Sequence, residues 1–229
     1  FKGRENTFVR TPLAEPQGNA NITQQQIEIK TDRAIEVEVK TFSSGSGETV
    51  LRYFYINCGP IEAKEVLEEY VDDISPGARL LEHTHTDPLD FKKEVLQYLK
   101  YYAPDYCKKA GDILIFRVPM IGKSCDAVGK EERRYPIVYE SKSYKKEEAE
   151  FNIPDGYEIH HLPEPIEIKT PWFEFHSSFK EEGEKVLYQG EFIRKAVKIP
   201  PEKYTNYRKS CKMMEKSCQR YVLFREKKR

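Results

Sequence analysis

Residues 24–40 read QQQIEIKTDRAIEVEVK, and this stretch decides the fold class. Isoleucine and valine alternate with glutamate and lysine on both sides of the segment Thr31-Asp32-Arg33. A period of two residues places apolar side chains on one face of a strand and charged side chains on the other. The pattern therefore predicts two half-buried strands that pair as a hairpin.

Further strand patterns follow along the chain and dominate its C-terminal half. Short apolar runs alternate there with turn signals such as Pro154-Asp155-Gly156 and Glu182-Gly183. Several short strands at this spacing are typical of an antiparallel β-sandwich. The predicted strands cover residues 95–102, 113–118, 137–139, 148–153, 157–161, 166–168, 172–179 and 185–197.

Two segments have helical spacing instead. The first begins at Pro60 and ends at Ser75-Pro76-Gly77, and the second follows Pro200-Pro201. In the second, apolar residues recur at steps of three and four, opposite a face of lysine and arginine, which predicts an amphipathic helix of about five turns. Its apolar stripe consists of Tyr204, Tyr207, Cys211, Met214, Cys218 and Tyr221. Residues 48–56 fit a strand and a helix equally well.

These patterns predict a mainly β (α+β) protein. We expect an N-terminal α+β domain with a hairpin and helices over residues 1–122. An antiparallel β-sandwich closed by the C-terminal amphipathic helix should follow over residues 123–229. The boundary is placed at a segment with two glycines and a charged run, residues 121–134.

Composition excludes several classes of protein. The chain has 229 residues, with 38 Lys and Arg against 38 Asp and Glu, and its 15 Tyr and 12 Phe argue against disorder. No apolar run reaches the roughly 18 residues of a membrane-spanning helix, and a neutral net charge does not favour nucleic-acid binding. The zero net charge, however, is the sum of two parts of the chain with opposite charge. Residues 201–229 hold ten Lys and Arg against three Glu, so a basic end follows an acidic body.

Several short motifs in the second half suggest a family. They are residues 134–137 (RYPI), 151–157 (FNIPDGY), 162–163 (LP), 197–200 (VKIP), Tyr204 and 221–223 (YVL). Together they resemble the C-terminal region of bacterial transglutaminase-like proteins, in which a cysteine-protease-like core precedes β-rich domains of unknown function. The resemblance covers nearly the whole chain, and it is better after residue 130 than before residue 90.

The resemblance implies a non-catalytic role. The catalytic core of that family uses a nucleophilic cysteine at a helix start with histidine and aspartate further along, and no part of this chain matches that arrangement. We therefore expect an accessory, structural or protein-interaction module. Its partner would be another protein or its own upstream catalytic core, and an oligomer is possible. The resemblance also implies an extracytoplasmic location. Because the chain begins at Phe1 without an initiator methionine, we expect a fragment or a processed product.

Two alternative functions rest on particular residues. Cys58 precedes a predicted helix, and with His83 or His85 and Asp87 it would form the site of a small hydrolase or acyl-transferase. Trp172 would serve a carbohydrate-binding module if its ring were exposed. The ordinary interpretation is a buried Cys58, and an alternation from Trp172 onward that buries Phe173 and Phe175.

The histidines and cysteines give weaker signals. His83 and His85 would share a metal only with a further strong ligand, and His160 and His161 should point to opposite sides of a strand. We expect no metal site, no cofactor and no catalytic residue. The five cysteines show no CxxC pair, and their odd number leaves room for one or two disulfides at most.

Overall fold

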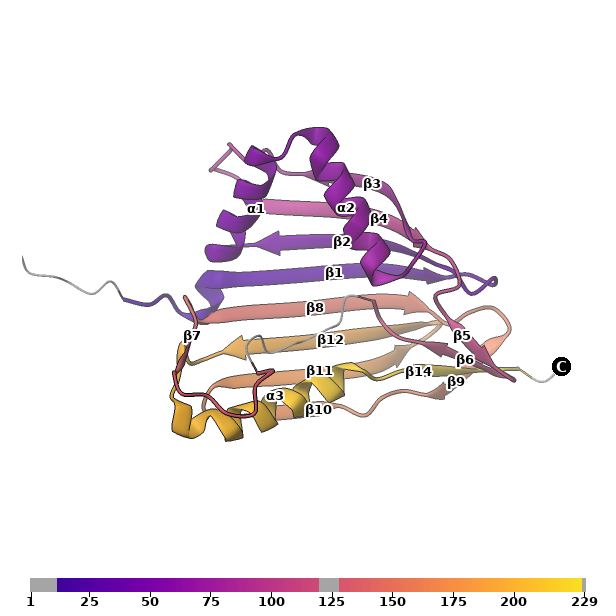
Figure 1. Ribbon diagram of the computed structural model, residues 1–229. Helices are drawn as coiled ribbons and strands as arrows, with labels where there is room; N and C mark the ends of the chain where they lie inside the picture. Colours follow the sequence, from indigo (N-terminus) through magenta and orange to yellow (C-terminus); the bar gives the residue numbers. More distant parts are fainter. Residues whose placement is uncertain (1–11, 120–127, 228–229) are drawn as a thin grey trace, which may run out of the picture.

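An eight-stranded sheet runs through most of the protein (Figure 1). The computed structural model describes residues 12–119 and 128–227. The strand order is β10-β11-β12-β8-β1-β2-β4-β3, and all neighbours pair antiparallel except β1 and β8, which are parallel. The strands are β1 (Ala20–Ile29), β2 (Ile35–Ser43), β3 (Arg79–His85), β4 (Val95–Ala103), β8 (Ser143–Asn152), β10 (Ile166–Lys169), β11 (Phe173–Glu182) and β12 (Lys185–Arg194).

The predicted hairpin is confirmed as β1 and β2. Ile27 pairs with Val37 and Ile29 with Ile35, and all four side chains are buried on the same face. Arg33 takes a positive φ of 74° in the turn. The alternation in the sequence thus fixes which face of this hairpin enters the core.

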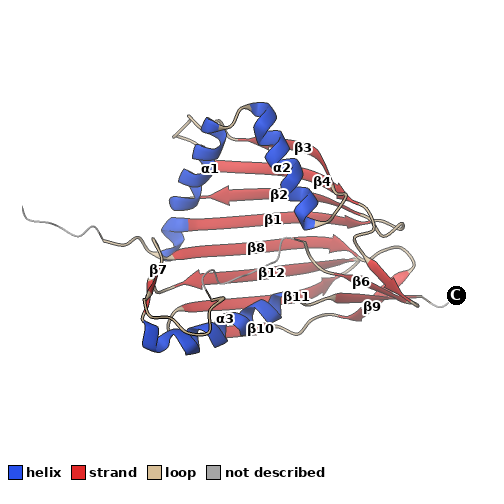
Figure 2. Ribbon diagram, viewed as in Figure 1, coloured by secondary structure: helices blue, strands red, loops and turns tan. Residues whose placement is uncertain are grey.

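Three helices lie against that same face of the sheet (Figure 2). They are α1 (Ser46–Asn57), α2 (Pro60–Ile74) and α3 (Tyr204–Cys218), so the ambiguous residues 48–56 form a helix. Leu67 and Val71 bury the inner side of α2 in the core. The chain turns from β2 into α1 at Gly45, whose φ is +60°. A Cβ there would lie 2.2 Å from the carbonyl oxygen of Gly18, so only glycine fits.

A second sheet covers one end of the first. It has the order β5-β6-β14-β9, and a small two-stranded sheet pairs β13 with β7. The ring centroids of Phe116 and Phe151 lie 4.8 Å apart and join the two larger sheets. The predicted mainly β fold with a sandwich-like core is therefore confirmed. The remaining elements are β5 (Lys108–Ala110), β6 (Ile113–Phe116), β7 (Ile137–Val138), β9 (Tyr157–His161), β13 (Lys198–Ile199), β14 (Val222–Glu226) and the 3₁₀ helices η1 (Pro16–Asn19) and η2 (Pro201–Lys203).

The C-terminal helix is shorter than predicted. Five of the six expected stripe residues are buried on α3, but the helix ends at Cys218 after about four turns. Tyr221 lies beyond it and is 50% exposed, so its assignment to the stripe was wrong. The chain turns there because residues 222–226 pair with both β6 and β9, and these ladders outweigh another helical turn.

The division into domains at residue 122 stays a prediction. Two pairings join the segments on either side of it. β1 pairs with β8 in the main sheet, and β6 pairs with β14 in the second sheet.

Candidate functional site

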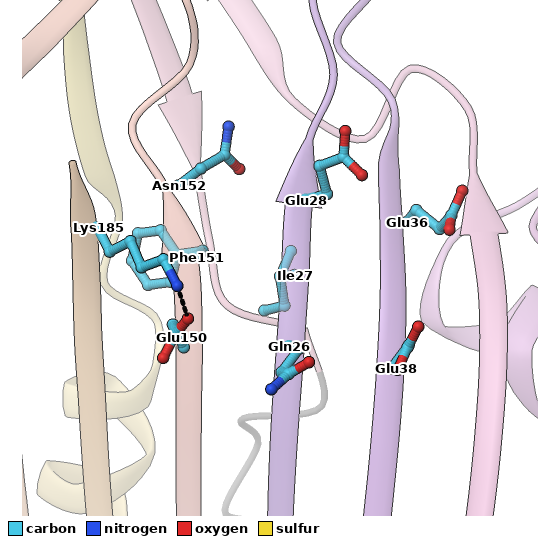
Figure 3. Close-up of a pocket in the computed structure, with 9 residues that line it drawn as sticks. All are labelled: Gln26, Ile27, Glu28, Glu36, Glu38, Glu150, Phe151, Asn152 and Lys185. Atoms are coloured by element: carbon cyan, nitrogen blue, oxygen red, sulfur yellow. Dashed lines mark hydrogen bonds and ion pairs between the residues drawn. The ribbon is translucent and has the colours of Figure 1, made fainter.

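A polar groove of about 310 Å³ lies on the face of the sheet opposite the helices, where β8 and β1 run parallel (Figure 3). Its polar side chains come from alternate positions of β1, β2 and β8 and from Lys185 of β12, so they share the solvent-facing side of the sheet, whereas Ile27 and Phe151 lie between them with side chains buried in the core. The lining residues are Gln26, Ile27, Glu28, Glu36, Glu38, Glu150, Phe151, Asn152 and Lys185.

Lysines neutralise the four glutamates of this groove. The Nζ atom of Lys100 lies 2.8 Å from Glu36 Oε1 and 3.2 Å from Glu38 Oε1. Lys30 pairs with Glu28 at 2.6 Å, and Lys185 pairs with Glu150. The hydrogen bond from Lys100 lowers the pKa of Glu36, and hydrogen bonds to Glu36 and Glu38 raise the pKa of Lys100. The Glu36 carboxylate therefore stays ionised at neutral pH.

Asn152 has a structural task in the same groove. Its Oδ1 atom accepts a hydrogen bond from the backbone N–H of Ile29 at 2.7 Å, and its Nδ2 atom donates to the Ile29 carbonyl oxygen at 3.2 Å. The side-chain amide thus continues the parallel ladder beyond the last backbone pair, Ile27 with Phe151. Asn152 therefore extends the contact between β1 and β8, and each of the four glutamates of the groove lies in an ion pair with a lysine.

The helix-covered side presents a different surface, which we call the charged helix face. It consists of the solvent-facing sides of α2 and α3, and the two helices carry opposite charge. On α2, six exposed acidic residues accompany one lysine; they are Glu62, Glu65, Glu68, Glu69, Asp72 and Asp73. On and beside α3, four exposed lysines face solvent; they are Lys203, Lys209, Lys212 and Lys216. The face is therefore acidic at one end and basic at the other.

Helix α1 adds apolar side chains beside α2. Val50 and Tyr53 are each 69% exposed and Ile56 is 49% exposed, at intervals of three residues. Such spacing places them along one stripe of the helix. Exposed apolar side chains that gather in one region mark surfaces that bind other molecules more often than isolated ones do.

The buried side of α1 carries a charged residue. The Arg52 side chain is only 5% exposed and pairs with Glu48 at 2.8 Å. Its guanidinium also donates to the carbonyl oxygens of Pro88 at 2.9 Å and Lys93 at 2.8 Å. Arg52 thereby fastens the connection between β3 and β4, residues 86–94, to the helix.

The residues of the Cys58 hypothesis make contacts with other groups. Cys58 is a half-buried free thiol at the C-terminal cap of α1. The ring of His85 stacks on Tyr55 with centroids 3.7 Å apart, and Asp87 Oδ1 accepts from the Leu89 N–H. Among residues 12–119 and 128–227, no hydrogen bond joins Cys58 to His83 or His85. The same residues contain no group of three or more possible metal ligands.

Trp172 lies in the bend before β11 and is half-buried. Its ring meets Tyr207 of α3 edge-on, with centroids 5.6 Å apart. Phe173 and Phe175 are buried, as the alternation predicted.

His160 contacts Arg225 across the second sheet, with 3.0 Å between its Nε2 and the arginine Nη2. His161 and His176 are exposed.

The cysteines and helices bear on the setting of the chain. Cys211 is disulfide-bonded, Cys58 and Cys107 are free thiols, Cys218 is buried, and Cys125 lies outside the described residues. Within the described ranges, the longest helices fall short of the length and apolar content needed to cross a membrane.

Sequence reasoning found the basic half of the charged helix face, the lysines of α3, but not the acidic half on α2. The acidic residues of α2 are visible in the sequence and would have been found by counting charge for each element. The exposure of Val50, Tyr53 and Ile56 could not be predicted from the sequence, because apolar residues at this spacing normally face the core. In the structure Arg52 occupies the buried side of α1 instead.

The comparisons with known proteins agree with part of the resemblance drawn from the motifs. The sequence model of a family described as a domain of unknown function with a solved structure, DUF3858, matches residues 112–224. A crystal structure described as that of a putative protease from Parabacteroides distasonis matches with a TM-score of 0.43 and 16% sequence identity. That match covers 51% of this chain and 24% of the protease chain, so this chain spans about a quarter of that protein. No curated protein matches.

Proposed function

We propose that the chain is a non-catalytic accessory region of a transglutaminase-like protein, and that it acts by binding a protein surface through the charged helix face. The observation that carries this proposal is the opposite charge of α2 and α3 on one side of the sheet (Figure 1). The match of residues 112–224 to a domain of unknown function supports the accessory role.

Charge separation of this kind favours orientation more than raw affinity. A single exposed ion pair contributes about 0.2–1 kcal/mol, but several pairs that form together steer a partner into one arrangement and raise its association rate. A partner must present a basic surface to α2 and an acidic one to α3. The upstream core and a second copy of the chain both qualify as partners. Two copies related by a two-fold axis would bring α2 of each against α3 of the other.

Sedimentation velocity at 50 and 500 mM NaCl tests the binding face with the chain itself as the probe. We expect association that increases with protein concentration and weakens in high salt. The double variant Lys209→Glu, Lys212→Glu should abolish it. Lys40→Glu, Lys92→Glu changes the net charge equally at exposed positions off α2 and α3 and should retain it. Salt-independent behaviour, or equal loss in both variants, contradicts a charged binding face.

The accessory role predicts a longer native protein. Antibodies raised against this chain should detect in the source cells a species larger than 26.9 kDa that also contains a transglutaminase-like core. A native protein of only 26.9 kDa contradicts the accessory role.

We place the protein outside the cytoplasm, and the disulfide at Cys211 supports this because disulfides persist in oxidising compartments. Cell fractionation tests the location.

The absence of catalysis is part of the proposal. A nucleophilic cysteine needs a nearby histidine or positive charge to form its thiolate, and the contacts described for Cys58 supply no such group. Amide and ester substrates should therefore remain intact in the presence of the purified chain. A hydrolysis or acyl-transfer activity that disappears when Cys58 is alkylated would contradict this expectation.

A further inference from the structure

A cavity of about 630 Å³ lies between α1 and the sheet, at the end of β1, β2 and β4 nearest to the start of that helix. Its volume falls within the roughly 300–1,000 Å³ of ligand pockets. The cavity faces the helix-covered side of the sheet, so it is distinct from the groove of Figure 3 and goes beyond the proposed protein-binding role.

The floor of this cavity is polar where a helix-covered sheet is normally apolar. Thr23 pairs with Thr41, and Thr41 pairs with Gln97, so these three side chains form a row across β1, β2 and β4. Asn21 pairs with Ser43 in the next row of the same face. Directly paired residues on one sheet face have Cβ atoms about 4.5–5.5 Å apart. The strand register thus places two adjacent rows of hydroxyl and amide groups on the cavity floor, and we call these five side chains the lattice.

These polar groups lack sufficient partners within the protein. Ser43 is only 8% exposed, and in the described part of the chain its hydroxyl makes no hydrogen bond, nor do those of Thr23 and Thr41. Gln97 donates its side-chain amide to Tyr55 Oη at 2.6 Å, and no described donor reaches its carbonyl oxygen. In the next row, Asn21 Oδ1 is buried with no hydrogen-bond partner among the described residues, and a buried polar group without a partner costs about 1–3 kcal/mol. The lattice therefore favours an occupant that donates and accepts hydrogen bonds.

The wall of the cavity opposite the sheet determines the polarity and charge of a ligand that would fit. Leu51, Phe54 and Tyr70 line the cavity from α1 and α2 and offer an apolar and aromatic surface. Among the described residues, no Lys, Arg or His lines it, and Glu140 is the one carboxylate that does. An anion would find no cation there and would meet that carboxylate. A neutral molecule with hydroxyls on one side and C–H groups on the other satisfies both surfaces.

We propose that this cavity binds a small neutral carbohydrate, a mono- or disaccharide, with its hydroxyls on the row Thr23, Thr41 and Gln97 and its apolar face against Phe54 and Tyr70. The class follows from the paired surfaces, because hydroxyl and amide groups can each donate or accept toward a sugar hydroxyl. Trp172, which lies on the α3 side of the protein, takes no part in this site.

An NMR titration of the ¹⁵N-labelled chain tests the proposal. The probes are glucose, galactose, mannose, N-acetylglucosamine, maltose and cellobiose, each up to 20 mM. We expect at least one sugar to shift the amide signals of Thr41 and Ser43, with saturation, and to leave the signals of β11 unchanged. Thr41→Val, which replaces a hydroxyl by a methyl of similar size, should weaken that binding at least tenfold. Thr84→Val, at an exposed position of β3, is the matched control and should bind as the parent does.

Two further variants keep the test decisive. If Thr41→Val fails to fold, Ser43→Ala removes another floor hydroxyl and should weaken binding at least threefold. Glu140→Gln should leave the affinity within twofold, because the ligand is neutral. The proposal is overturned if no sugar shifts the cavity signals, if Thr84→Val weakens binding as much as Thr41→Val does, or if Glu140→Gln abolishes binding, which would indicate a cationic ligand.

Discussion

Replacing Arg52 by methionine should release the connection between β3 and β4 from the rest of the fold. Methionine keeps an unbranched apolar stem in the space of the arginine stem but removes all five donors. The lost hydrogen bonds include those to the carbonyl oxygens of Pro88 at 2.9 Å and Lys93 at 2.8 Å, together with the pair to Glu48.

The magnitude follows from these contacts. Hydrogen bonds from a charged group contribute about 1.5–3 kcal/mol each, and an i,i+4 ion pair on a helix adds about 0.3–0.5 kcal/mol. The freed carbonyls of an exposed connection regain water, which offsets part of the loss. We therefore expect Arg52→Met to lower the free energy of unfolding by about 3 kcal/mol. At about 2–4 °C per kcal/mol for a chain of this size, Tm should fall by about 6–12 °C.

Urea unfolding and hydrogen exchange measure the two consequences separately. Exchange should accelerate in residues 86–94 and at the start of β4, where the N–H of Thr86 bonds to the carbonyl of Leu96 at 2.9 Å. Strands β11 and β12 should keep their protection. Arg79→Met is the matched control, because Arg79 is exposed on β3, and its stability should change by less than about 0.5 kcal/mol.

Either of two results would refute the reasoning. Equal destabilisation by Arg52→Met and Arg79→Met would mean that burial of the guanidinium carries no special weight. Unchanged exchange in residues 86–94 of a destabilised Arg52→Met variant would mean that other contacts hold the connection.

Three further predictions concern the core, the outer face and the thiols. Phe151→Ala should lower the free energy of unfolding by about 3–5 kcal/mol in urea titrations, because it opens a cavity between the sheets, whereas the exposed Phe91→Ala should cost less than about 1 kcal/mol. Lys100 lowers the folded-state pKa of Glu36, so this carboxylate stabilises the fold above its unfolded pKa of about 4.3, and the contribution is lost as the pH falls through the lower folded value. Glu36→Gln should accordingly flatten the pH dependence of Tm below about pH 5, and an unchanged profile would count against the pair. Burial raises the pKa of Cys107 to about 12, so iodoacetamide at pH 8 should modify this thiol only after denaturation, and peptide mass spectrometry that finds it modified in the native protein would contradict its burial.

The elements themselves were largely predictable from sequence. The hairpin of β1 and β2, helix α2 and the stripe of α3 follow from local periods, because the pattern of side chains along one element reports which side is buried. Residues 48–56 and Tyr221 show where local patterns fail. An inward arginine reverses the apparent amphipathicity of α1, and a strand pairing interrupts the helix before Tyr221.

The candidate sites were less accessible to sequence reasoning. Cys58 and Trp172 were candidates because of the chemistry of their side chains. Their surroundings depend on where α1 and α3 pack in the fold, and the sequence does not predict those positions. The cavity floor is a clearer example. Thr23, Thr41 and Gln97 are unremarkable polar residues in three separate strands, and only the register of the sheet places them in one row.

The sequence by itself determined that the chain is mainly β, which face of each strand is apolar, and that a basic end follows an acidic body. The tertiary structure alone decided that β1 and β8 run side by side, with Gln24 and Glu148 in hydrogen-bond contact across 124 residues of chain. It also decided that α2 and α3 share one side of the sheet. The physical reason is that alternation specifies a face but not a neighbour. Strand partners and helix positions are selected by how well whole surfaces pack together, and no local stretch of sequence contains that information.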